Sequence, residues 1–318
     1  MVQHEFTFPS ADGKTAIHAV EWLPEGEILA VLQISHGVSE YILRYAPFAA
    51  FLTERGFAVV GHDHLGHGDS VAVGAPRLYF GPKGSWNWVV DDIYTRRKLA
   101  GCRFPGVPHF LLGHSMGSFL ARTYLIGYPG TVDGAILMGT GQMSPALIAG
   151  GKLVAARESR RVGAAGCSPV IMKLAFENYN SHFSPNRTGF DWLSVSRKNV
   201  DWYIAHPLCG GNPTIGLFRE MLDGLSIIAR PENLKKMNLN IPILFISGAM
   251  DPVGDFGKGV RRAYESFQKA GVREVSIKLY PTLRHEILNE DCKEEIYQDL
   301  YQWMAARLPD RVGGFVCP

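Results

Sequence analysis

Two short stretches of the sequence carry residues whose types and spacing could do chemistry. Residues 61–70 read GHDHLGHGDS, and residues 113–117 read GHSMG. In the first stretch His62, His64 and His67 are spaced almost like an H-x-H-x-D-H zinc cluster, and imidazoles and carboxylates are good zinc ligands. Gly66 stands where that cluster needs its Asp, so the second stretch has to be weighed against it.

GHSMG fits the pattern G-x-S-x-G. It directly follows the apolar run HFLLG and directly precedes the helix-length segment SFLARTYLIGY. That context is the strand–turn–helix of a nucleophile elbow, in which glycines permit a turn that a Cβ would obstruct. The pattern therefore predicts that the Ser115 hydroxyl lies exposed above a sheet and acts as a nucleophile.

A serine nucleophile needs a base and an acid, which in this architecture follow it in the order acid, then histidine. ISGAMDPVGD places Asp251 just after a predicted strand, with Asp255 as a close competitor in the same loop. YPTLRHEI places His285 after the next strand, and no other histidine follows Asp251. The predicted catalytic residues are Ser115, Asp251 and His285.

Acyl transfer also needs N–H donors for the developing oxyanion. We expect one from Met116, directly after the nucleophile, and one from the loop ISHGVSE at 34–40. Val38 is the predicted donor there, because Gly37 lets the loop turn inward. His36 either braces this loop or is a satisfied core residue.

The elements that would position these residues alternate along the chain. Residues 4–10 and 15–24 alternate in polarity and predict an antiparallel hairpin. Apolar runs bounded by turn residues predict strands buried on both faces at 28–35, 56–63, 109–115, 133–140, 241–248 and 275–281. Amphipathic segments predict helices at about 43–55, 87–100, 117–127, 257–270 and 293–307. The alternation predicts a doubly wound α/β sheet with helices on both faces.

Residues 142–228 break this alternation. They carry helical pieces separated by Pro and Gly but no comparable apolar strand. We expect an inserted helical lid there, over a core made of 1–141 and 229–318. Its aromatic and aliphatic residues would form lid core or, where some face a cleft, favour an apolar acyl group. These residues are Phe176, Tyr179, Phe183, Trp192, Trp202, Tyr203, Leu217 and Phe218.

Taken together, the motifs resemble the α/β-hydrolase superfamily, and within it the monoacylglycerol lipase and lysophospholipase branch grouped with serine aminopeptidases. The markers are ISHGVSEY, GHDHLGHGDS, GHSMG, SGAMDPV and His285. The resemblance implies a mostly parallel eight-stranded sheet with a lid. It also implies that GHDHLGHGDS corresponds to the D-x-x-G-x-G-x-S turn of these hydrolases, in which the histidines would have a structural role. The branch tends to have H-G-x-G-E in the oxyanion loop, and this chain has Ser39 at the second Gly.

The resulting prediction is a serine hydrolase that cleaves carboxylic esters of apolar acyl groups, of monoacylglycerol or lysophospholipid type, with no metal or organic cofactor. Haloalkane dehalogenases and epoxide hydrolases share the fold but place an aspartate at the elbow, so Ser115 counts against them. A small-ester carboxylesterase, an aminopeptidase of the same fold and a ligand-binding homologue without turnover stay open as alternatives.

Composition excludes several other classes. The 318 residues carry a formal net charge of only +2 and no long basic block, so nucleic acid is not an expected partner. The five cysteines are scattered and predict free thiols; they are Cys102, Cys167, Cys209, Cys292 and Cys317. No run reaches the roughly 20 apolar residues that span a bilayer. We expect a cytoplasmic protein, with transient contact between its lid and a membrane surface left open and no oligomeric state predicted.

Overall fold

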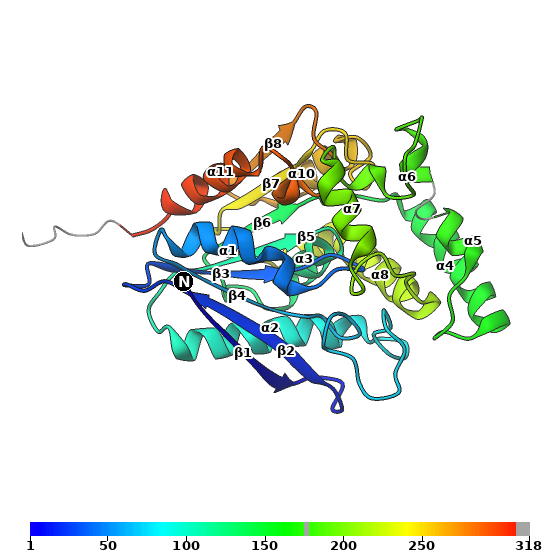
Figure 1. The fold of residues 1–318 in the computed structure, drawn as a ribbon, viewed down its shortest axis with the longest axis horizontal. Coiled ribbons are helices and arrows are strands. Elements are labelled where there is room, and N and C mark those ends of the chain that lie inside the picture. The colour runs from blue at the N-terminus through cyan, green and yellow to red at the C-terminus, as the bar shows by residue number, and fades with distance from the viewer. Residues whose placement is uncertain (175–177, 310–318) are drawn as a thin grey trace, which may run out of the picture.

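The computed structural model describes residues 1–174 and 178–309, and an eight-stranded sheet forms its centre (Figure 1). The strands lie in the order β1-β2-β4-β3-β5-β6-β7-β8. β2 pairs antiparallel with β1 and β4, and every other neighbouring pair is parallel. The bounds are β1 Val2–Pro9, β2 Ala16–Leu23, β3 Ala30–Ser35, β4 Phe57–His62, β5 His109–His114, β6 Gly134–Met138, β7 Ile243–Gly248 and β8 Val275–Tyr280. The predicted mostly parallel sheet is confirmed.

The sequence signal for the strands was a continuous apolar run, which predicts burial on both faces of the sheet. All residues of β3, β4, β5, β6 and β7 are buried, as their continuous apolar runs predicted. The predicted bounds of the six parallel strands differ from the observed ones by no more than two residues at either end.

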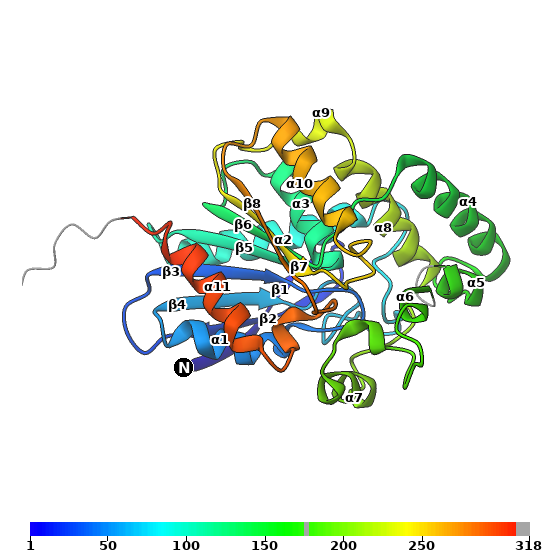
Figure 2. The same cartoon turned by 90° about the horizontal axis from the view of Figure 1, so that it is seen from above.

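Helices cover both faces of this sheet, as Figure 2 shows from above. On one face the 3-10 turn η1 (Ile42–Tyr45), α1 (Ala46–Thr53) and α11 (Lys293–Ala305) pack against one set of strand side chains. On the other face α2 (Trp86–Arg103), α3 (Met116–Gly127) and α10 (Lys258–Ala270) pack against the alternate set. Each predicted core helix is therefore confirmed. Within the described residues, no helix combines the length and apolarity needed to cross a bilayer.

Between β6 and β7, the described part of residues 142–228 contains helices and loops but no strand. They lie beyond the carboxyl ends of the parallel strands (Figures 1 and 2). They are α4 (Pro145–Val162), α5 (Pro169–Met172), α6 (Asn178–Ser181), η3 (Asp191–Leu193), α7 (Arg197–Ala205) and α8 (Ile215–Ile228). Leu217, Leu222 and Ile228 of α8 belong to the hydrophobic cluster that lies between the sheet and the helices α2, α3 and α10. This helical segment is thus anchored to the core through α8. The short α9 (Pro231–Leu234) and η4 (Ile287–Asn289) complete the fold.

Candidate active site

Ser115 occupies the sharp turn between β5 and α3. Its backbone has φ 53° and ψ −122°, a region that non-glycine residues rarely adopt. A Cβ at Gly117 would lie 2.0 Å from the Ser35 carbonyl oxygen, and one at Gly113 would lie 2.4 Å from the Gly117 oxygen. Only glycine fits these two positions, so the local sequence explains how the strained turn can form.

His285 lines the same cavity as Ser115, its ring lies 4.8 Å from that of His114, and it contacts Asp251. Nδ1 of His285 is 2.9 Å from Oδ2 of Asp251, and both side chains are buried. Asp251 also accepts the Val253 N–H at 2.9 Å, which fixes the carboxylate. A proton on Nδ1 donated to Asp251 leaves Nε2 as the basic nitrogen. Asp255 instead forms an exposed ion pair with Arg262, so Asp251 is the carboxylate that orients His285.

A cavity of about 500 Å³ opens over these groups. Ser115, His285, Gly37 and Val38 line it at the sheet, whereas the helical segment supplies most of the remaining wall. That wall is largely apolar and includes Met172, Phe190, Trp192, Leu193 and Tyr203. The site therefore places a serine and an imidazole in the wall of a largely apolar cavity.

Of the aromatic and aliphatic residues expected in the lid, Trp192 and Tyr203 line the cavity, whereas Leu217 is core. Phe176 lies outside the described residues. Sequence reasoning missed Phe190 and Met172, which lie near short helices with no readable periodicity.

The two expected oxyanion donors occupy suitable backbone positions. Met116 is the first residue of α3, where an N–H has no partner within its helix. The Gly37 N–H is already committed, because it donates to Oε1 of Glu40 at 2.5 Å. A Cβ at Gly37 would lie 3.1 Å from the Ser115 Cβ, so this glycine contributes space. Val38 follows it and lines the cavity.

His36 braces the oxyanion loop and is fully buried. Its Nδ1 donates to the Gly37 carbonyl at 2.7 Å, and its Nε2 accepts the His64 N–H at 2.9 Å. Burial lowers the pKa of His36, which keeps the imidazole neutral, so that Nδ1 can donate a hydrogen bond and Nε2 can accept one. Of the two roles open for His36, the structure favours the brace.

A buried ionic network behind the oxyanion loop could not be read from the sequence. Glu40 accepts hydrogen bonds from Gly37 N–H, the Tyr45 hydroxyl (3.0 Å), His114 Nδ1 (3.0 Å) and Arg44 Nη1 (2.8 Å). Burial alone would raise the pKa of Glu40, but His114 and Arg44 outweigh it and hold that pKa well below its usual range.

The same network reaches Glu286, the neighbour of His285 in the chain. Arg44 donates to both oxygens of Glu286 at 2.8 Å, across 242 positions of sequence. The His114 ring lies 4.8 Å from the His285 ring, measured between centroids. Burial lowers the pKa of His114, yet its bond to Glu40 raises it overall, so the Glu40–His114 contact has the character of an ion pair. The network thus connects the loop at 34–40 with the surroundings of His285.

Ser39, the departure from H-G-x-G-E, has a left-handed backbone with φ 56°. Glycine adopts this conformation without strain, which explains the family's preference. Here the Ser39 hydroxyl donates to the Gly211 carbonyl at 2.7 Å, and the Ser39 carbonyl accepts the Tyr203 hydroxyl at 3.1 Å. The serine therefore ties the oxyanion loop to the helical segment.

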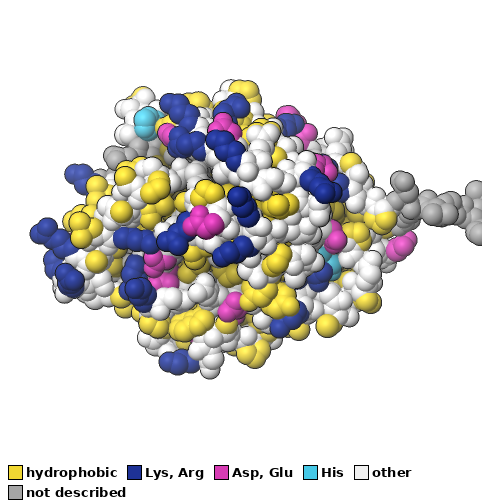
Figure 3. Space-filling model, turned by 180° about the vertical axis from the view of Figure 1, so that it is seen from behind, with side chains coloured by type: hydrophobic (Ala, Val, Ile, Leu, Met, Phe, Trp, Pro, Cys, Tyr) yellow, Lys and Arg dark blue, Asp and Glu magenta, His cyan; other side chains and the backbone are white. Residues whose placement is uncertain are grey.

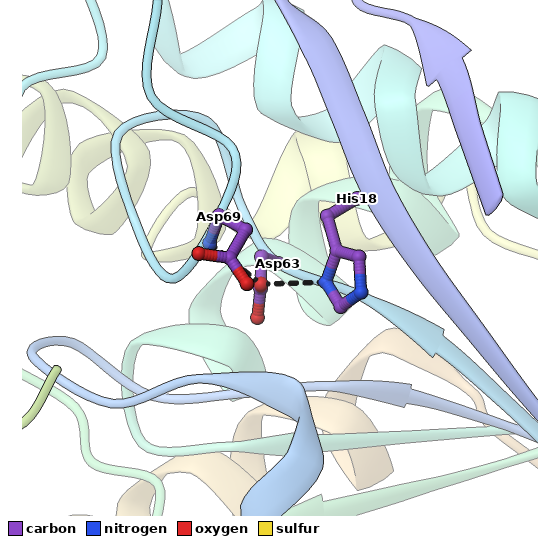
Figure 4. A group of neighbouring side chains, drawn as sticks. All are labelled: His18, Asp63 and Asp69. Carbon is purple, nitrogen blue, oxygen red and sulfur yellow. Dashed lines mark hydrogen bonds and ion pairs between the residues drawn. The ribbon is translucent and has the colours of Figure 1, made fainter. Parts of the chain in front are cut away.

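The histidine rings of the loop GHDHLGHGDS pack against one another, with centroids 5.1 Å apart for His62 and His64 and 6.5 Å apart for His64 and His67. Burial lowers the pKa of His62 and of His67 to about 3, and that of His64 well below its usual value. In the described part of the chain, three residues bring possible ligand atoms within 4.8 Å of one another: His18, Asp63 and Asp69 (Figure 4).

The chemistry of this group argues against a metal role. Asp63 already accepts bonds from His18 Nδ1 (2.8 Å) and from the Ile42 and Asp69 N–H groups. The hydrogen bond to Asp63 raises the pKa of His18 to about 9, so the ring is protonated at neutral pH and has no free lone pair for a metal. A Cβ at Gly68 would lie 2.1 Å from the Asp63 carboxylate, which explains the glycine. These contacts fix the backbone of the loop around Asp63.

Comparison with known proteins agrees with this geometry. Residues 26–292 match the model of a family described as serine aminopeptidase, S33. The chain belongs to this family. It is 27% identical over 289 residues to the monoglyceride lipase of Homo sapiens, covering 90% of this chain and 86% of that protein. It is 26% identical over 313 residues to the monoacylglycerol lipase of Mycolicibacterium smegmatis, covering 96% and 98%.

Among solved structures, a thermostable carboxyl esterase from Bacillus coagulans in complex with glycerol superposes with a TM-score of 0.89 at 28% identity, covering 97% of this chain and 99% of that one. These similarities agree with the elbow serine and the apolar chamber. The chain is a serine hydrolase of carboxylic esters with the α/β-hydrolase fold.

Proposed function

We propose that this enzyme hydrolyses esters of long apolar acyl chains, of the monoacylglycerol or lysophospholipid type, through an acyl-serine at Ser115. The observation that carries the proposal is the buried Asp251–His285 pair, whose His285 lines an apolar cavity of about 500 Å³ together with Ser115. Relatives named monoglyceride lipase support the choice of substrate class. The apolar wall would bury the acyl chain, and burial of apolar surface favours long chains over short ones.

In the proposed mechanism His285 Nε2 takes the Ser115 proton as Oγ attacks the ester carbonyl. The Met116 and Val38 N–H groups stabilise the oxyanion, and the alcohol leaves with the proton from His285. The same histidine then activates water, which releases the fatty acid from Ser115. Asp251 stabilises the imidazolium in both steps through its 2.9 Å bond.

We further propose that residues 142–228 act as a lid on the core formed by 1–141 and 229–318. The cavity supports this division, because Ser115 and His285 come from the core whereas Met172, Phe190 and Trp192 come from the helical segment. An acyl chain in this cavity would contact both parts at once.

An aminopeptidase of the same fold would need a free carboxylate to hold a substrate amine. Among the residues that the structure describes, the cavity wall contains two carboxylates, Glu40 and Glu286. Arg44 pairs with both, and His114 and Asn199 bond to Glu40 and Glu286 respectively. Neither is available to a substrate ammonium, so the wall favours esters.

The membrane contact expected of the lid has support at its outer surface. Figure 3 shows basic side chains with hydrophobic ones between them at the end of the molecule opposite the C-terminal trace. On α4 and around α5, five large apolar residues are exposed: Leu147, Leu153, Val162, Val170 and Leu174. We propose that this surface contacts anionic lipid transiently, because Arg157 and Arg160 are exposed on the same helix.

We also propose a cytoplasmic location, supported by the free thiols of Cys102, Cys167, Cys209 and Cys292; Cys317 lies outside the described residues.

The test compares wild type with Ser115→Ala on a short nitrophenyl ester, a long-chain monoacylglycerol, a lysophospholipid and an aminoacyl amide, with and without chelator. We expect hydrolysis of the long-chain esters, no effect of chelator and loss of turnover in the variant. Preference for the short ester alone would make the enzyme a small-ester carboxylesterase. Tight binding without turnover would make it a ligand-binding homologue.

A further inference from the structure

One buried cation lies where the helical segment meets the core. Arg122 belongs to α3, about two turns after Ser115, and its side chain is fully buried. Its guanidinium donates to the Gly141 carbonyl at 2.9 Å and to Oε1 of Gln142 at 2.5 Å. It also donates to the Ile228 carbonyl at 3.4 Å. The chain leaves the core at Gly141 and returns after Ile228, so one side chain contacts both ends of the segment.

The acceptors of Arg122 are all neutral. The described residues give it no carboxylate partner, and burial lowers the pKa of Arg122 to about 9. A buried charge is costly unless its environment compensates it. The compensation comes from the three oxygens at the ends of the segment, together with the Phe267 ring 5.7 Å away. Any movement of either end would remove part of this compensation.

The first of these ends also abuts the loop of the catalytic acid. A Cβ at Gly141 would lie 2.5 Å from the Val253 carbonyl oxygen, so the two backbones are in close contact. The Val253 N–H in turn donates to Asp251. A displacement at Gly141 would therefore move both the cavity wall and the carboxylate that orients His285.

We propose that Arg122 is a positioning residue that holds both ends of the segment 142–228 and thereby fixes the cavity wall above Ser115. The inference rests on the proposed function, since only a long acyl chain needs that wall. A short ester reacts at Ser115 without reaching Met172 or Phe190. Loss of Arg122 should consequently change selectivity for chain length more than it changes turnover of the short ester.

The test uses Arg122→Met, with Arg96→Met as its matched control. Arg96 is equally buried, but it pairs with Glu21 on the far strand β2 and does not contact the segment. We expect Arg122→Met to reduce the ratio of kcat/KM for the long ester to that for the short ester by about threefold to tenfold. Amide exchange in α4 and α8 should accelerate. Arg96→Met should lower Tm without changing the ratio, and Gln142→Leu should produce a smaller shift in the same direction.

Equal ratios and equal exchange in the two arginine variants would overturn the proposal and leave Arg122 as a packing residue. If Arg122→Met fails to fold, Arg122→Lys keeps the charge but cannot reach acceptors on both sides, and the same change in ratio is expected. Should wild type cleave neither ester, the proposed function would fail. The exchange measurement would still decide whether Arg122 holds the segment.

Discussion

Replacing Glu40 with glutamine perturbs the buried network behind the oxyanion loop with almost no change in shape. Oε1 of Glu40 accepts three hydrogen bonds, from Gly37, Tyr45 and His114, and Oε2 accepts one from Arg44. In the variant the amide oxygen can face the three donors. The amide NH₂ must then face the Arg44 guanidinium, donor against donor.

The expected cost follows from this geometry. Removing one partner of a buried ion pair costs about 3–5 kcal/mol. Arg44 keeps its two bonds to Glu286, which lowers the expected loss for Glu40→Gln to about 2–3 kcal/mol. For a chain of this size that corresponds to a fall in Tm of roughly 4–8 °C. Because the Gly37 amide loses its charged acceptor, kcat should also fall, by about tenfold, with KM little changed.

The assay pairs thermal unfolding with ester hydrolysis and uses Glu220→Gln as a control. Glu220 is also fully buried, accepts the Gly84 and Trp86 N–H groups and pairs with Arg219, but it does not line the cavity. The control should lose stability and keep its kcat. A Glu40→Gln enzyme with wild-type kcat would refute the link between this network and the oxyanion loop, and an unchanged Tm would refute the energetic argument.

Three further outcomes follow from the same structure. Asp251→Asn should lower kcat by about 10⁴-fold, because the wrong tautomer of His285 is then favoured, whereas Asp255→Asn should leave kcat unchanged; the reverse result would reassign the acid. Ser39→Ala should lose about 1 kcal/mol of stability with the bond to Gly211, and Ser39→Gly should lose less because glycine relieves the left-handed strain; equal denaturation midpoints would contradict this. The pKa of His18 in the folded protein is raised to about 9. Its contribution of about 1–2 kcal/mol to the free energy of unfolding should therefore be complete below pH 6.5 and lost as pH rises through 9. The stability difference between wild type and His18→Gln should shrink over that range.

The strands and the candidate catalytic residues could be predicted because their signals are local. A strand that is buried on both faces has a continuous apolar sequence whatever it packs against, as β3 and β5 do. The elbow is specified by Gly113, Ser115 and Gly117, whose turn needs those glycines. His285 followed from chain order alone, and the structure places it against Asp251.

Features that depend on distant partners could not be predicted. Nothing in the sequence pairs Arg44 with Glu286, because the fold alone brings the two together. Cavity residues such as Phe190 lie among helices of three or four residues, which are too short to show a period. Arg122 looks like a polar position on an amphipathic helix, yet its side chain is fully buried against both ends of the helical segment.

The central claim is that Ser115 forms the acyl-enzyme. The most direct measurement is rapid quenching of enzyme mixed with a long-chain nitrophenyl ester, followed by intact-protein and peptide mass spectrometry. We predict a burst of nitrophenol stoichiometric with enzyme and an acyl mass on the peptide containing Ser115, with neither in Ser115→Ala. Turnover that survives Ser115→Ala, or an acyl adduct mapped to another residue, would contradict the account.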